Sequence, residues 1–230
     1  MKHLNAYIIE KLKINSNTKS YAYTPKDYVE LKDILAQRLE EDKNANLNDI
    51  DVSGITDMGS LFWKLDPHKI DISEWDVSNV TDMHSMFSAC QNLQCDLSKW
   101  DVSMCTNMRN MFNLCNKFNS DLSNWDVSNV TNMGTMFYNC FKFNSDLSKW
   151  DVADVKNFAA MFTNCENFNA DLSEWFVRDC KDFEHMFYGC KKINFDVTKW
   201  QVSEYIDYRK INDMFKHCIS LKKLPKWYRE

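Results

Sequence analysis

Side chains able to do chemistry recur at fixed positions along this chain. Aspartates and cysteines form two series, each with a spacing of 25 residues. The first series is Asp71, Asp96, Asp121, Asp146, Asp171 and Asp196, and the second is Cys90, Cys115, Cys140, Cys165 and Cys190. If equivalent residues lie close in space, the carboxylates form a row that could bind calcium, and the thiols form a row that could make disulfides or bind metal. The structural alternative is that aspartate caps tight turns and cysteine fills an apolar interior.

The sequence favours the structural interpretation of both series. A serine follows most of the aspartates two residues later, as in Asp121-Leu122-Ser123, which suits a turn whose carboxylate accepts a backbone N–H. The Gly-rich nonapeptide of calcium-binding β-helices is absent, and no CxxC pair supports zinc. Cys105 and Cys180 replace valine in an apolar column, so we expect buried, reduced thiols and no metal or cofactor. Cys95 stands in a different column and is expected to be more accessible.

Catalysis has little support. The five histidines are scattered rather than grouped, and serine and aspartate are abundant because the turn repeats, so combinations of Ser, His and Asp arise by chance. Gly-rich phosphate loops are also absent. We therefore expect a protein that is not an enzyme, and a metal-dependent activity on either series is the least favoured alternative.

A 25-residue repeat must position these side chains. Tryptophans mark it at Trp75, Trp100, Trp125, Trp150, Trp175 and Trp200, and the copy over 125–149 reads WDVSNVTNMGTMFYNCFKFNSDLSK. In that copy, steps of three and four residues separate Val130, Met133, Met136, Phe137 and Cys140, which predicts one face of a short helix. Polar residues separate Leu147, Trp150 and Val152, which predicts a short strand and a turn. The predicted fold is an α/β solenoid of about seven strand-plus-short-helix coils.

The consensus WDVSNVTxMxxMFxxCxxFNxDLSxW resembles the repeat of the BspA-like leucine-rich-repeat surface proteins, which is also typical of Mycoplasma surface lipoproteins. The resemblance covers roughly residues 50–227, with an irregular last coil and an insertion near Tyr205 to Lys210. It implies a leucine-rich-repeat-like array, location at a cell or particle surface, and binding of proteins rather than catalysis. Because a repeat scaffold hosts many partners, it says more about fold than about function.

Residues 1–49 do not repeat and are predicted to form an N-terminal cap. Thr24-Pro25 precedes a series with one apolar face, which predicts a helix over about 25–41. A weaker amphipathic candidate runs from Met1 to Ile14. We expect this part of the chain to cover the first coil, whose apolar edge would otherwise aggregate. The alternative is that it serves as a recognition or assembly tag.

Charge and hydropathy exclude several classes of partner. The net charge is −5, and no Lys/Arg cluster follows a groove, so neither nucleic acid nor an anionic membrane is an expected partner. No run of 18 apolar residues predicts a membrane span. The first 20 residues lack the apolar region of a signal peptide, which predicts a protein that is cytoplasmic as synthesised. A phage or mobile-element protein that reaches a surface by particle assembly or lysis would fit both expectations.

Six side chains in variable columns are candidates for partner binding, because the repeat does not require them. They are Tyr138, Phe141, Phe176, Arg178, Tyr188 and Phe195. Exposed aromatic residues tend to anchor interfaces, although Phe176 and Phe195 would alternatively fill gaps where the last coils depart from the consensus. The predicted function is non-enzymatic adhesion or recognition, in which a lateral surface of a monomer or weakly self-associating chain binds a protein. The alternative is a structural component, attached to a larger particle through the N-terminal segment or the ends of the array.

Overall fold

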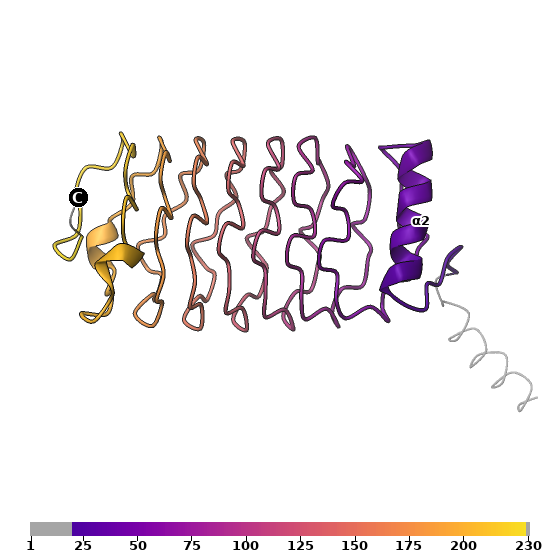
Figure 1. Ribbon diagram of the computed structural model, residues 1–230, viewed down its shortest axis with the longest axis horizontal. Coiled ribbons are helices and arrows are strands. Elements are labelled where there is room, and N and C mark those ends of the chain that lie inside the picture. The colour runs from indigo at the N-terminus through magenta and orange to yellow at the C-terminus, as the bar shows by residue number, and fades with distance from the viewer. Residues whose placement is uncertain (1–19, 229–230) are drawn as a thin grey trace, which may run out of the picture.

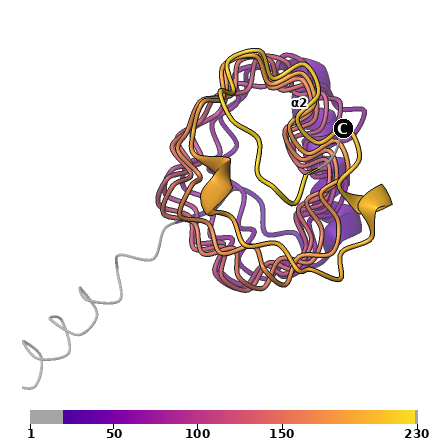
Figure 2. The ribbon, with the colours of Figure 1, turned by 90° about the vertical axis from the view of Figure 1, so that its left-hand side faces the viewer.

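The chain winds into a stack of similar coils. The computed structural model describes residues 20–228, so the candidate helix from Met1 to Ile14 lies outside the described residues. The coils follow one another along a single axis, with the N-terminal helix at one end and the C-terminus at the other (Figure 1). Seen along that axis, the coils superpose on one oval outline (Figure 2). Their apolar columns are buried and form one continuous core.

The predicted α/β solenoid of strand-plus-helix coils is wrong. Over residues 20–228 the structure has one α-helix, α2 (Tyr28–Glu41), and two short 3-10 helices, η2 (Val197–Lys199) and η3 (Tyr208–Lys210). This part of the chain contains no named strand and no sheet, only isolated parallel β-bridges between neighbouring coils. The coils are therefore built almost wholly from turns.

The segment predicted as a helix in each coil is a series of tight turns. The N–H of Met136 donates to the carbonyl of Met133 at 3.1 Å, and the N–H of Cys140 donates to that of Phe137 at 3.0 Å. These are bonds to the third residue back, whereas an α-helix uses the fourth. A chain of such turns also places apolar residues at steps of three and four, so the spacing alone does not distinguish it from a helix.

The other N–H groups of this segment point at the next coil. The N–H of Phe137 donates to the carbonyl of Met161 at 2.9 Å, and that of Asn139 donates to Thr163 at 2.8 Å. Left-handed backbone at Thr135 (φ +56°) and Asn139 (φ +59°) makes this alternation possible. Such residues leave the helical conformation every few positions, which is why no helix propagates.

The segment predicted as a strand is also a turn. The N–H of Trp150 donates to the carbonyl of Leu147 at 3.1 Å, and Asp146 Oδ1 accepts the N–H of Ser148 at 3.0 Å. The bridges between coils lie mainly in another column: Asp57, Asp82, Asn107, Asn132, Asn157 and Asp182. Each bridge joins one residue to its equivalent in the next coil, so the contact never lengthens into a strand pair.

Helix α2 covers the first coil. Asp27 caps its N-terminus by accepting the N–H of Glu30 at 3.0 Å. Leu31, Leu35 and Leu39 are fully buried and join the core. The bridge from Asn46 to Asp71 already follows the 25-residue register, so the coil pattern starts slightly before residue 50. The division of the chain into a cap and a repeat unit remains a prediction.

Two side-chain ladders tie the coils together from inside. Each repeat tryptophan donates its Nε1–H to a carbonyl 28 residues earlier, as Trp125 does to Leu97 at 3.0 Å. Each ladder cysteine points its thiol at a phenylalanine carbonyl 28 residues earlier, as Cys140 does to Phe112 at 3.0 Å. Equivalent aromatic rings stack, with Trp125 and Trp150 centroids 6.4 Å apart. The tryptophans and cysteines that recur in each repeat thus join neighbouring coils.

Candidate partner-binding surface

The six candidate side chains do not form one surface. Tyr138 and Tyr188 occupy equivalent turns, and Phe141 follows three residues after the first of them. Phe176 and Arg178 lie on a different turn of the coil, just after a repeat tryptophan. Phe141 and Phe176 are 36% and 52% exposed, and both tyrosines are half-buried. A partner contacting one group would therefore not automatically contact the other.

Phe195 is a correction to the candidate list, because the structure buries it. Its side chain is 8% exposed and packs against Phe187 and Trp200, with centroids 5.7 and 5.8 Å away. In an earlier coil the same position is Ser120, whose hydroxyl accepts the N–H of Leu97 at 2.9 Å. The position faces inward, so the gap-filling interpretation applies to Phe195.

Tyr188 is held between two imidazoles. Its ring meets those of His185 and His217 edge to face, at centroid distances of 5.7 and 5.1 Å. This contact joins the last regular coil to the final one. Tyr188 therefore has a packing role at the junction of these two coils.

Arg178 lies beside a further exposed aromatic residue, Tyr205. A hollow of about 340 Å³ is lined by Arg178 and by the chain from Gln201 to Tyr205. Tyr205 is 88% exposed and Tyr208 is 58% exposed. We call Phe176, Arg178, Tyr205 and Tyr208 the C-terminal aromatic surface. In the sequence, only the insertion indicates that these two tyrosines lie outside the core pattern, because neither occupies a repeat column.

A second hollowed region runs along the aspartate row. One hollow of about 600 Å³ extends from Lys69 to Asp121, and another of about 420 Å³ extends from Asn119 to Lys149. Both are shallow and share Asn119, Ser120 and Asp121. Small floor residues leave the surface hollow here, whereas the hollow lined by Phe195 at the equivalent place further along is smaller, about 240 Å³.

The aspartates of this row are engaged in turns. The backbone N–H and the hydroxyl of Ser123 hydrogen-bond Asp121 and hold its pKa below the ordinary value. Ser98 does the same for Asp96, and Ser148 for Asp146. Each carboxylate thus stabilises its own turn, which is the structural interpretation of the series.

All nine cysteines are free thiols. Burial raises the pKa of Cys90 and Cys105 to about 12, so both stay protonated at neutral pH. Cys95 is half-buried in the floor of the larger hollow, and burial also raises its pKa. These thiols are poor nucleophiles and poor metal ligands in the folded chain.

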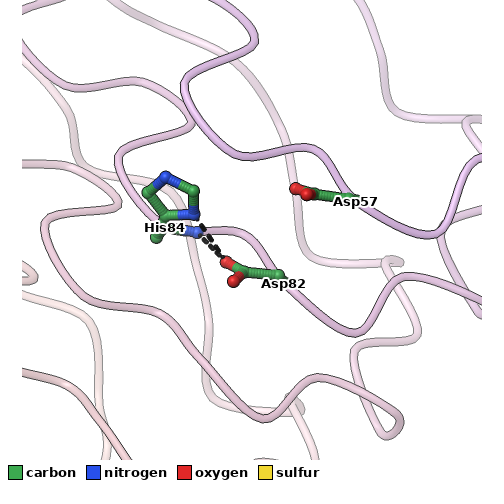
Figure 3. Close-up of side chains that lie close together, drawn as sticks. All are labelled: Asp57, Asp82 and His84. Atoms are coloured by element: carbon green, nitrogen blue, oxygen red, sulfur yellow. Dashed lines mark hydrogen bonds and ion pairs between the residues drawn. The ribbon is translucent and has the colours of Figure 1, made fainter.

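One group of potential metal ligands is found among residues 20–228. Ligand atoms of Asp57, Asp82 and His84 lie within 4.8 Å of one another, from two neighbouring coils (Figure 3). Asp82 Oδ1 accepts the N–H of His84 at 2.8 Å and lies 2.9 Å from its Nδ1. Asp57 accepts the N–H of Gly59 at 2.8 Å, and a Cβ at this glycine would clash with the His84 ring. Every member thus has a protein contact that accounts for its position.

Comparison with known proteins gives one match. The sequence model of a family described as "Mycoplasma protein of unknown function, DUF285" matches residues 30–140 and 115–227. These two matches together include α2 except its first two residues, and almost the whole coil stack. No curated protein and no solved structure matches the chain. None of the helices over residues 20–228 has the length and apolar character needed to cross a membrane. From the extent of the family match, the chain belongs to the repeat-containing DUF285 family.

Proposed function

We propose that this protein is a non-enzymatic recognition module that binds a partner protein through its C-terminal aromatic surface. The observation that carries the proposal is the departure of Phe176 and Arg178 from the repeat at exposed positions. Equivalent turns carry aspartate and serine there, as Asp126 and Ser128 do. The fold therefore does not need an aromatic ring or a guanidinium at these places.

Aromatic and arginine side chains suit recognition for physical reasons. Burying about 100 Å² of apolar surface contributes roughly 2.5 kcal/mol, and tyrosine adds a hydroxyl that can hydrogen-bond at the rim. Arginine offers five N–H donors in a planar fork, which lets Arg178 pair with a carboxylate. Interface hot spots are enriched in these residue types. The hollow between Arg178 and Tyr205 would receive one side chain of the partner.

The resemblance of the repeat to BspA-like leucine-rich-repeat surface proteins supports the same proposal. It implies protein binding at a cell or particle surface, and adhesion is the form of recognition we propose. The rigidity of a coil stack supports it further, because side chains on a fixed scaffold lose little conformational freedom on binding.

A consensus-restoring variant tests the proposal. Partners are first identified by affinity purification from the native host and mass spectrometry, and each is then titrated against the purified chain. We expect the double variant Phe176→Asp, Arg178→Ser to weaken binding at least tenfold without changing the thermal unfolding midpoint, because both replacements are found in other coils.

The matched control is Met104→Asn. Met104 is 55% exposed, and asparagine stands at its place in other coils, so this change also removes an exposed apolar side chain. It should leave binding unchanged. Equal loss of binding in both variants, or no loss in the double variant, would overturn the assignment of the surface.

A further inference from the structure

Within one turn segment of each coil, the hydrogen bonds to neighbouring coils all run in the same direction, although Thr131 and its equivalents, just before this segment, donate the opposite way. In the turn segment of each coil, N–H groups donate toward the C-terminal neighbour and carbonyls accept from the N-terminal one. Examples are the N–H of Ala160 to Glu184 at 2.7 Å and that of Phe162 to Met186 at 2.9 Å. Aligned peptide groups add their dipoles, as they do in a helix. The C-terminal end of this face of the stack is therefore its positive end.

The last coil leaves its N–H row without acceptors. Asp213 (φ +49°) and His217 (φ +65°) repeat the left-handed conformations of Ala160 and Asn164 in an earlier coil. By this equivalence, the N–H groups of Asp213, Phe215 and His217 point away from the end of the stack, which faces the viewer in Figure 2. None of the three has an acceptor among residues 20–228.

The opposite edge of the stack is closed. The Tyr28 hydroxyl donates to the carbonyl of Gly59 at 2.8 Å, and Lys32 Nζ donates to that of Ser60 at 3.0 Å. Both donors belong to α2, which also covers the first coil. The Tyr28 hydroxyl thus satisfies one carbonyl of this edge, and the Lys32 ammonium lies beside it, as expected for its negative character. A second copy cannot stack head to tail on the open edge, because its own carbonyl edge lies under α2.

A hollow lined by both apolar and polar side chains adjoins the unpaired N–H row. It has a volume of about 530 Å³ and is lined by the chain from Asp213 to Ile219, together with Leu221, Leu224 and Tyr228. Ile219 is 80% exposed and Leu224 is 38% exposed. A row of donors beside such a hollow matches a peptide in the turn conformation of a coil, which presents the carbonyls of alternate residues along one edge, as Asp182, Glu184 and Met186 do.

We propose that the open edge of the last coil binds a segment of another protein that adopts the turns of a coil, is acidic overall and carries an apolar anchor side chain. Its carbonyls accept the N–H groups of Asp213, Phe215 and His217, as the next coil would, and its anchor enters the hollow at Leu224. The acidic character follows from the positive end of the aligned peptide dipoles. This site uses backbone groups and is independent of the C-terminal aromatic surface.

The probe is a fluorescently labelled peptide with the sequence of residues 181–189, KDFEHMFYG, which supplies carbonyls to a neighbouring coil in the native stack. Binding to the full chain is measured by anisotropy, and amide hydrogen exchange is followed at Asp213, Phe215 and His217. We expect these amides to exchange rapidly in the free chain and at least tenfold more slowly with peptide. A peptide carrying serine in place of its methionine and both phenylalanines should not bind.

Two variants make the test specific. Leu224→Asp should weaken peptide binding at least tenfold, because it places a charge in the hollow, whereas Met104→Asp in a middle coil should not. The double variant Phe176→Asp, Arg178→Ser should still bind, which separates this site from the proposed function. Amides already protected in the free chain, binding without their protection, or a dimer in solution that buries them would overturn the proposal.

Discussion

At the scale of single residues, the repeat tryptophan combines packing with a buried hydrogen bond. The indole of Trp125 stacks on Trp150 and donates to the carbonyl of Leu97 at 3.0 Å. A buried carbonyl that loses its donor costs about 1–3 kcal/mol of stability. We predict that Trp125→Phe, which keeps an aromatic ring, lowers the free energy of unfolding by about 2–4 kcal/mol, with the smaller ring adding to that loss. Urea denaturation measures the change.

The control for this prediction is Trp63→Phe. Trp63 lies outside the tryptophan column and is 46% exposed, so its replacement should change the free energy of unfolding by less than about 1 kcal/mol. Similar losses in both variants would show that the ladder hydrogen bond adds nothing measurable.

Thiol reactivity gives a second prediction at this scale. Because burial raises the pKa of Cys90 and Cys105 to about 12, thiolate is scarce at pH 8 in the folded chain. We predict that Ellman's reagent labels no thiol rapidly in native protein and all nine in guanidinium chloride. Any slow native phase should disappear in Cys95→Ser, since only that thiol is half-buried rather than buried. Rapid labelling of the native Cys95→Ser variant would contradict the buried ladder.

The sequence predicted the interior more reliably than the surface. The Trp, Val, Met-Phe and Cys columns are buried, because a residue type that recurs at one place in every coil reports a packing constraint. Phe195 breaks its column, which leaves a partner-binding role and a gap-filling role both open in the sequence, and the structure buries it. The repeat pattern does not identify Tyr205 and Tyr208 as exposed, because residues of an insertion have no equivalents in the other coils.

At the scale of elements, apolar spacing could not distinguish a helix from a run of turns. Both place apolar residues three and four apart, and what differs is where the intervening N–H groups go. Left-handed residues such as Thr135 and Asn139 send those groups to the next coil. Only Gly189 among the left-handed positions described is glycine, so the usual sequence signal for this conformation is missing. In contrast, α2 has a proline just before it, a capping aspartate and an apolar face.

The turns capped by Asp96, Asp121 and Asp146 should contribute to the loss of stability at low pH. Hydrogen bonds from serines lower the pKa of Asp96, Asp121 and Asp146 in the folded chain. A lowered folded pKa means that the stabilisation is complete above the unfolded value of about 3.9 and is lost as pH falls through the folded value. We predict that replacing all three by asparagine, which can still cap a turn, makes the thermal unfolding midpoint fall less steeply as the pH is lowered. The difference should appear between about pH 5 and pH 2, where these carboxyls take up protons.

A single substitution, Asp33→Asn on α2, serves as the comparison, because Asp33 is not one of the aspartates that cap the repeat turns. It should leave the acid limb as steep as in the parent chain. Thermal unfolding followed by circular dichroism across the pH series measures both variants. An equally steep limb in the triple variant would mean that other groups govern acid unfolding.

At the scale of the whole molecule, the hydrogen bonds and ring contacts between coils over residues 20–228 join neighbouring coils. Stability is then close to a sum of coil and interface contributions, and coils are interchangeable units. We predict that excising residues 126–150, so that Trp125 is followed by Asp151, leaves a folded protein with a lower unfolding midpoint. The cut removes one complete period, so the Trp and Cys ladders and the N–H row of each coil still meet equivalent partners.

The same reasoning predicts that a shorter deletion does more damage. Removing only residues 126–137 takes out fewer residues, yet it sets every later turn opposite the wrong part of its neighbour. Buried carbonyls would lose their tryptophan and cysteine donors, and apolar columns would face polar ones, at a cost of several kcal/mol against a typical stability of about 5–15 kcal/mol. We expect this variant to be unfolded by circular dichroism and to lose cooperative melting. If instead the in-register excision unfolds while the shorter deletion survives, contacts between distant coils, rather than nearest-neighbour stacking, must hold the molecule together.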